Sequence, residues 1–163
     1  MESGKMSDST TPNDESGMTG LLGEKMALEN LARKVAAFLS PEFARIELEY
    51  SAAGPVGSAK LRAVRFDEST TSFPRPQLHD AVAELRSAMY RPSAGTWFSM
   101  RMTVSAAGSV DVSFNYDDLP PTSFDFAPDA YAADLRAFPR DTEHIPQWLS
   151  EQLDADRRAR EAQ

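Results

Sequence analysis

The sequence predicts an α+β domain, in which an antiparallel sheet of two hairpins packs helices on one face. Three observations lead to this fold class. Two stretches, at about 45–66 and 97–117, show the strand–turn–strand pattern of a β-hairpin. Helical stretches with apolar residues at three- and four-residue steps lie before, between and after them. The expected order of elements is α-ββ-α-ββ-αα.

The chain of 163 residues fits one domain with tails. Residues 1–19 are rich in small polar and acidic residues that cannot offset the entropy cost of ordering, so we expect a disordered tail. Residues 20–153 form the expected domain, and 154–163 a charged helix end or tail. A first helix over about 20–39 ends at Ser40-Pro41, because the residue before a proline avoids the α conformation. Its apolar stripe comprises Leu28, Leu31, Val35, Phe38 and Leu39.

The first hairpin begins at 45–50, where apolar and charged residues alternate and one face of the strand is therefore wet. Residues 54–57, Gly-Pro-Val-Gly, have turn chemistry, and 60–66 form the returning strand. A helix then opens at 73–76, since proline is tolerated in a first helical turn. Its buried stripe is expected to comprise Leu78, Val82, Leu85 and Met89.

The second hairpin is the clearest structural signal. Apolar residues alternate with polar ones along 98–104 and again along 110–117, and a glycine-containing turn at 106–109 joins the two strands. Two helices, around 131–138 and from Pro146 onward, complete the fold. In the outgoing strand, one face of the sheet is expected to receive Phe98, Met100, Met102 and Val104.

Composition excludes several classes of function. The chain has no cysteine, which excludes disulfides and thiolate metal sites. Its net charge of −8 argues against nucleic-acid binding, which needs cations to neutralise phosphates. No apolar run approaches the roughly 18 residues of a membrane span, and no secretory signal is visible at the N-terminus. We therefore expect a cytoplasmic protein without a membrane or nucleic-acid partner.

Negative charge is concentrated in the second half of the chain. From Met102 to Leu135, a stretch of 34 residues, there are six aspartates and no Lys or Arg, which suits a basic partner. Asp117 and Asp118 leave three alternatives open: turn capping with one solvated aspartate, partner binding, or a catalytic or metal role. The two carboxylates diverge if the strand continues through Asp118, and both can face outward if the chain turns at Asp117.

No catalytic or metal-binding constellation is recognisable. Nothing around the aspartate pair supplies the opposed environments that split the pKa values of a catalytic pair. His79 and His144 lack the companions of a zinc site, and nucleophile and phosphate-loop motifs are absent. We expect no enzyme activity, no metal and no cofactor. Phe124 and Phe126, in a Pro/Ser/Asp loop, are either exposed anchors for a partner protein or a lid over the core edge.

Four short stretches carry a family resemblance: Gly-Thr-Trp-Phe at 95–98, Phe-Asn-Tyr-Asp-Asp at 114–118, Phe-Pro-Arg at 138–140 and Ile-Pro-Gln-Trp-Leu at 145–149. They resemble the YezG-like immunity-protein family, over roughly residues 22–153. The resemblance implies a small bacterial α+β protein that neutralises the toxic C-terminal domain of a polymorphic toxin, in several cases a nuclease.

An acidic surface is suited to occlude the basic cleft of such a toxin and to speed the encounter. The alternatives are a small enzyme that uses Asp117 and Asp118, and a regulatory module whose tails recruit partners. The expected partner-binding residues are Asp117, Asp118, Phe124, Asp125, Phe126 and Asp129.

Overall fold

The fold is given by a computed structural model that describes residues 13–74, 76–122 and 125–163, with side chains from residue 20 onward. Within these residues the helices are α1 (Asn13–Ala36), α2 (His79–Ala88), α3 (Pro128–Ala137), the short 3-10 helix η1 (Thr142–His144) and α4 (Gln147–Glu161). The strands are β1 (Phe43–Ala53), β2 (Val56–Arg65), β3 (Thr70–Phe73), β4 (Ser99–Ser105) and β5 (Val110–Asn115).

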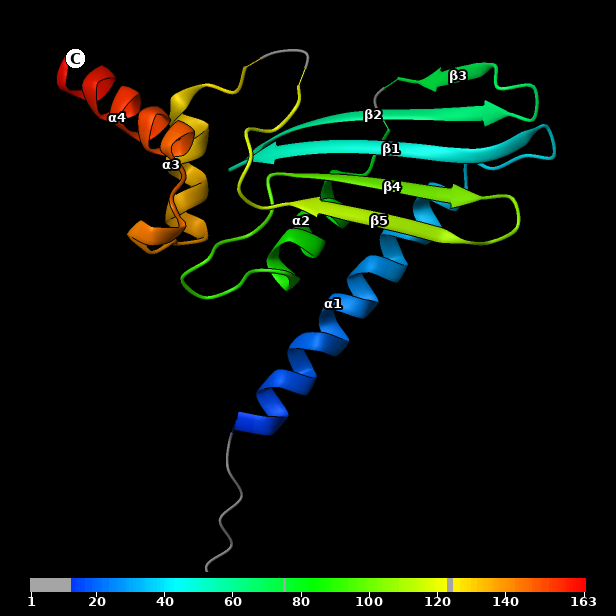
Figure 1. Ribbon diagram of the computed structural model, residues 1–163, viewed down its shortest axis with the longest axis horizontal. Coiled ribbons are helices and arrows are strands. Elements are labelled where there is room, and N and C mark those ends of the chain that lie inside the picture. The colour runs from blue at the N-terminus through cyan, green and yellow to red at the C-terminus, as the bar shows by residue number, and fades with distance from the viewer. Residues whose placement is uncertain (1–12, 75, 123–124) are drawn as a thin grey trace, which may run out of the picture.

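The strands form one antiparallel five-stranded sheet with the order β3-β2-β1-β4-β5 (Figure 1). Both predicted hairpins are present, because β1 pairs with β2 and β4 pairs with β5. The hairpins are joined by the pairing of β1 with β4, in which Leu48 lies opposite Met102. The predicted α+β class is confirmed.

Helices α1 and α2 cover one face of the sheet (Figure 1). The apolar residues of the alternating strands are buried on this face together with Leu31 and Val35 of α1 and Leu85 of α2, each 0% exposed. The periodicity of both helices and of both hairpins therefore describes the same core. No helix in the described part of the chain covers the other face, as the alternate charged residues of the strands predict.

A second, smaller core lies at one end of the sheet, where α3 stacks against α4 (Figure 1). Phe98 and Leu149 are fully buried there. The Tyr131 ring lies edge to face against both Phe98 and Trp148, with centroids 6.0 and 5.4 Å apart. The two C-terminal helices thus close the end of the sheet and do not form part of the layer made by α1 and α2.

Two predictions about the strands were wrong. Phe73 does not open a helix: it ends the edge strand β3, opposite Leu61 of β2, and α2 begins only at His79. The four-residue strand is too short to show an alternating pattern. Phe98 does not share the core of Met100 either, because it precedes β4, where the regular alternation has not begun, and packs in the second core.

The chain ends differ from the prediction in extent. Helix α1 begins at Asn13 and not at about residue 20, and residues 1–12 of the predicted tail lie outside the described residues. The division into tail, domain and C-terminal segment stays a prediction, although α4 continues as helix to Glu161. Among the described helices, none combines the length and the apolar character of a membrane span.

Candidate partner-binding surface

The chain turns directly after β5, so that Asp117 and Asp118 leave the sheet. Asn115, the last residue of β5, holds this turn with its side-chain amide. Its Oδ1 accepts the N–H of Asp118 at 2.8 Å, and its Nδ2 donates to the carbonyl oxygen of Asp118 at 2.9 Å. An asparagine side chain that binds the backbone a few residues on is a common turn device. Asn115 contacts the main chain of Asp118 and not its carboxylate, and Asp118 is exposed.

A buried arginine, Arg140, holds the same turn from the interior of the fold. The side chain of Arg140, which is 1% exposed, donates to the carbonyl oxygens of Tyr116 at 2.6 Å and Thr96 at 2.9 Å. It also reaches Oδ1 of Asp117 at 3.4 Å, and its guanidinium lies 4.9 Å from the ring centre of Phe98. Burial lowers the pKa of Arg140, and the charge of Asp117 opposes that shift. Asp117 is therefore partly neutralised from inside the fold.

Gly95 makes room for Arg140. Its φ of +82° lies in the left-handed region, and a Cβ at this position would collide with the Arg140 side chain. Gly95 and Arg140 are 45 positions apart in the sequence, yet the absence of a side chain at Gly95 leaves the space that the Arg140 side chain occupies. Both belong to the short stretches that carry the family resemblance.

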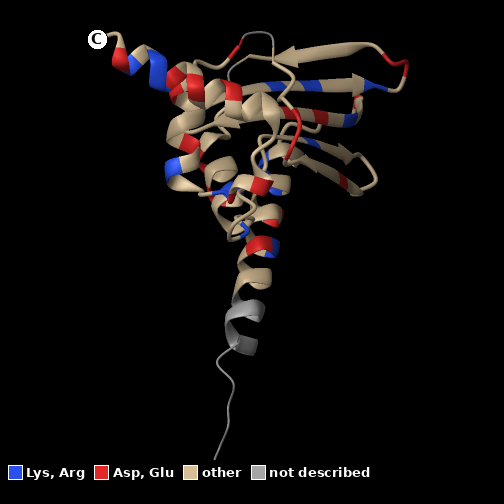
Figure 2. Cartoon of the chain, turned by 60° about the vertical axis from the view of Figure 1, so that its left-hand side comes forward, with Lys and Arg blue, Asp and Glu red and all other residues tan. Residues whose placement is uncertain are grey.

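The surface at this end of the sheet is acidic and includes one exposed apolar side chain, Leu119. The carboxylate-bearing side chain of Asp117 is 74% exposed, and Leu119, two residues on, is 55% exposed. Asp118, Asp125 and Asp129 are exposed and form no ion pair with any described residue. We call the segment from Asp117 to Leu119 the acidic loop. Figure 2 shows where acidic and basic residues lie along the chain.

The acidic loop is attached to the second core. The indole N–H of Trp148 donates to the carbonyl oxygen of Asp117 at 2.7 Å, and the Ser51 hydroxyl of β1 donates to that of Pro121 at 3.2 Å. Trp148 in turn packs on Tyr131. Burial raises the pKa of Tyr131 to about 12, with a further contribution from the negative charge of Asp125, which places that aspartate beside the same core.

Of the two phenylalanines, Phe126 does not provide the expected exposed anchor. Phe126 is 4% exposed and packs edge to face on Tyr131, with ring centroids 6.0 Å apart. It therefore covers the core edge, which was the alternative interpretation from the sequence. Phe124 lies outside the described residues. Leu119, which composition alone did not single out, is the exposed apolar residue of the acidic loop.

One aspartate of the acidic segment is structural. Asp134 is 1% exposed, lies 2.8 Å from Nη1 of Arg86 and accepts the N–H of Gly54 at 2.9 Å. Its charge is neutralised within the fold and contributes nothing to a surface. Asp111 lies at the other end of β5, beside the turn from β4, so counting aspartates along the sequence overstates the acidity of this end of the sheet by two residues.

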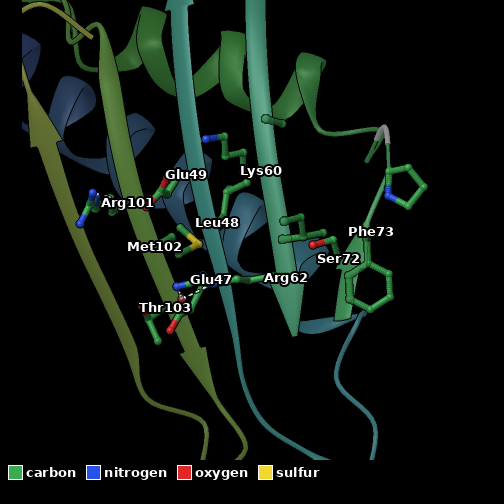
Figure 3. Close-up of a pocket in the computed structure, with 13 residues that line it drawn as sticks. Glu47, Leu48, Glu49, Lys60, Arg62, Ser72, Phe73, Arg101, Met102 and Thr103 are labelled. Atoms are coloured by element: carbon green, nitrogen blue, oxygen red, sulfur yellow. Dashed lines mark hydrogen bonds and ion pairs between the residues drawn. The ribbon is translucent and has the colours of Figure 1, made fainter. Parts of the chain in front are cut away.

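The open face of the sheet is a second polar surface (Figure 3). It forms a hollow of about 880 Å³ whose charged lining residues come from three strands. Arg62 reaches across to Glu47 with an N–O distance of 2.5 Å, and Arg101 lies 3.4 Å from Glu49. Partial burial raises the pKa of Glu47, but hydrogen bonds from two arginines outweigh this and the pKa is lowered.

The histidines and the acidic loop do not form a metal site in the part of the chain that the structure describes. No group of three or more His, Asp or Glu side chains is placed to hold a metal ion there. His79 is exposed at the start of α2, where its Nδ1 lies 3.3 Å from the Tyr50 hydroxyl. The carboxylates of the acidic loop do not line the hollow on the open face of the sheet.

A comparison with protein families gives one match. Residues 60–139, about half of the chain, match the family described as Immunity protein YezG-like. The chain is YezG-like. This confirms the family drawn from the sequence over residues that run from within β2 through α3 and include the acidic loop. The first helix, β1 and the stretch at 145–149 lie outside the match. No curated protein matches the chain. The family supports an immunity role and suggests an inhibitor that performs no chemistry.

Proposed function

We propose that this YezG-like protein is an immunity protein that binds a cognate bacterial toxin domain and occludes its active site with the acidic loop and the neighbouring Asp125 and Asp129. The observation that carries the proposal is the rigid presentation of unpaired carboxylates. Asp118, Asp125 and Asp129 form no ion pair with described residues, while hydrogen bonds from Asn115, Arg140 and Trp148 hold the backbone of residues 116–118 around Asp118.

Rigid presentation matters because ordering a loop costs free energy on binding. A loop that is already held in place loses little conformational freedom when a partner docks. The exposed carboxylates would attract a basic cleft and raise the association rate. Leu119 would supply the desolvated apolar contact that interface centres require. A toxin that acts on a phosphate-bearing substrate fits this surface, since its cleft must attract negative charge.

The test is co-expression with the toxin domain encoded beside this gene. Wild-type protein should restore growth and form a complex that survives gel filtration. Asp118→Lys combined with Asp125→Lys should lower the association rate at least about tenfold and abolish protection, because both charges face the partner. Neither side chain has an ion-pair partner among the described residues, so the urea unfolding midpoint should stay close to that of the wild type.

The matched control is Glu84→Lys combined with Glu161→Lys, which makes the same charge change at two exposed positions on α2 and α4, outside the acidic loop. It should retain protection and complex formation. Full protection by the double variant, with an unchanged association rate, would exclude the acidic loop as the contact surface. Absence of any complex with the wild-type protein would exclude the immunity role itself.

A further inference from the structure

The open face of the sheet carries a cluster of basic side chains whose role the proposed function does not explain. Three cations line the hollow, against two carboxylates, in a chain whose net charge is −8. The carboxylates, Glu47 and Glu49, belong to the central strand β1, and the cations flank them on both sides. The lining cations are Lys60, Arg62 and Arg101.

The pairing register fixes how these charges are spaced. Lys60 of β2 and Arg101 of β4 lie directly opposite Glu49 on its two sides, and Arg62 lies opposite Glu47. Glu47 is bound by two arginines, with Arg45 at 2.9 Å in addition to Arg62, so that the guanidinium of Arg62 is held in place. Lys60 forms no ion pair with any residue described, and Arg101 is held only at 3.4 Å. Lys60 and Arg101 therefore remain able to bind anionic groups of a partner.

We propose that this hollow binds an extended acidic segment of a protein partner, with carboxylates at alternate residues and the segment lying along β2. Lys60 and Arg62 are two positions apart on one face of β2, which separates their Cα atoms by about 6.8 Å. An extended peptide repeats its side chains on one face with the same period. Two carboxylates at i and i+2 can therefore meet Lys60 and Arg62 together.

The rest of the lining suits such a segment. Ser72 of β3 and Thr103 of β4 place hydroxyl groups on opposite sides of the hollow, where they can bind main-chain groups of the segment. Ser72 lies opposite Arg62, and Thr103 lies opposite Glu47 (Figure 3). On the other side of Glu49, Arg101 can donate hydrogen bonds to a further carboxylate of the partner.

A nucleic acid fits this hollow less well than an acidic peptide does. A phosphate backbone is continuously charged, and its path across the sheet would pass over Glu47 and Glu49 in the centre. A peptide can place neutral side chains at those points. The hollow and the acidic loop would bind different partners or different parts of one, because the acidic loop attracts positive surfaces and the hollow attracts negative ones.

The probe is a short fluorescent peptide in which Glu and Thr alternate, titrated into the full-length protein and followed by anisotropy. We expect saturable binding that weakens as salt is added. A peptide with the same composition but with its glutamates contiguous should bind more weakly, because only alternate carboxylates match β2. Equal binding of the two peptides would overturn the proposed register, and absence of binding at low salt would overturn the site.

Lys60→Glu combined with Arg101→Glu should lower the affinity for the alternating peptide at least about tenfold, since two attractive charges become repulsive. Both side chains are exposed, so folding should be preserved, as circular dichroism can verify. The matched control, Arg136→Glu with Arg158→Glu, makes the same charge change on α3 and α4 and should leave binding unchanged. Equal loss in both double variants, or tighter binding of a single-stranded oligonucleotide than of the peptide, would refute the proposal.

Discussion

A single buried ion pair, Arg86 with Asp134, connects parts of the molecule that are distant in the sequence. Arg86 of α2 also donates to the carbonyl oxygen of Trp97 at 2.9 Å, and its guanidinium lies 5.6 Å from the Trp97 ring centre. Asp134 of α3 receives the N–H of Gly54 in the turn between β1 and β2. Both charged side chains are nearly inaccessible to water, so removing either partner would leave a buried, unpaired charge and lower the free energy of unfolding substantially.

Asp134→Asn should therefore destabilise the protein by about 3–5 kcal/mol, because it leaves the charge of Arg86 buried and uncompensated. Urea unfolding followed by tryptophan fluorescence measures this change. Asp129→Asn, an exposed aspartate in the first turn of the same helix, is the control and should cost less than about 1 kcal/mol. Similar unfolding midpoints for the two variants would show that the ion pair does not stabilise the fold.

The sequence does not distinguish these two aspartates. Asp129 and Asp134 occur in the same cation-free stretch, and Arg136, the first cation after it, is not the partner of Asp134. The partner of Asp134 is 48 positions away, in another helix, and only the tertiary structure brings it within 2.8 Å. The charge pattern predicts an acidic end of the sheet, but long-range pairing decides which carboxylates stay at the surface.

At the scale of elements, helix α1 packs unevenly. Its buried stripe includes Leu31, which is 0% exposed, whereas Leu22, more than two turns earlier, is 58% exposed. In Figure 1 the N-terminal part of α1 extends away from the sheet. Its contribution to stability should therefore come from the C-terminal half.

Leu31→Ala should cost about 2–5 kcal/mol, through lost burial and the cavity left behind. Leu22→Ala makes the same chemical change on the exposed part and should stay within about 0.5 kcal/mol. Thermal or urea unfolding of both variants gives the comparison. A large loss for Leu22→Ala would mean that the N-terminal part of α1 is covered in solution.

The elements with strong periodicity could be predicted from the sequence, and the short or irregular ones could not. Alternation located β1, β4 and β5, and the stripe from Leu78 to Met89 located α2. Strand β3 has only four residues, and a proline next to it indicated a helix start. In the acidic loop, the turn was one of two open alternatives. The hydrogen bonds between the Asn115 side chain and Asp118 are a local signal, but those from Arg140 and Trp148 are long-range and could not be read from the sequence.

At the scale of the whole molecule, the two cores make stability depend on pH at the alkaline end. Tyr131 belongs to the second core, and its pKa is raised from 10.0 to about 12, first by burial and then by the charges of Asp125 and Asp134. The folded state therefore favours the neutral phenol. This contribution to stability is fully present below pH 10 and is lost as the pH rises toward 12.

Tyr131→Phe tests this linkage, because it removes the ionisable group and keeps the ring. The wild-type unfolding midpoint in urea should fall between pH 9 and pH 12, and the variant should fall less over the same range. Burial also raises the pKa of Tyr50 and Tyr116, so some alkaline loss will remain in the variant. Identical pH profiles for both proteins would contradict a role for Tyr131.

The pairing of β1 with β4 has a consequence for how the chain acquires its structure. β1 and β2 are adjacent in the sequence and can pair early, but the other edge of β1 stays open until Ser99–Ser105 has been synthesised. Closing this contact spans about 50 residues, which makes it the slow, entropically costly step. During that interval the nascent chain presents an unpaired strand edge, so premature release from the ribosome would favour aggregation over completion of the sheet.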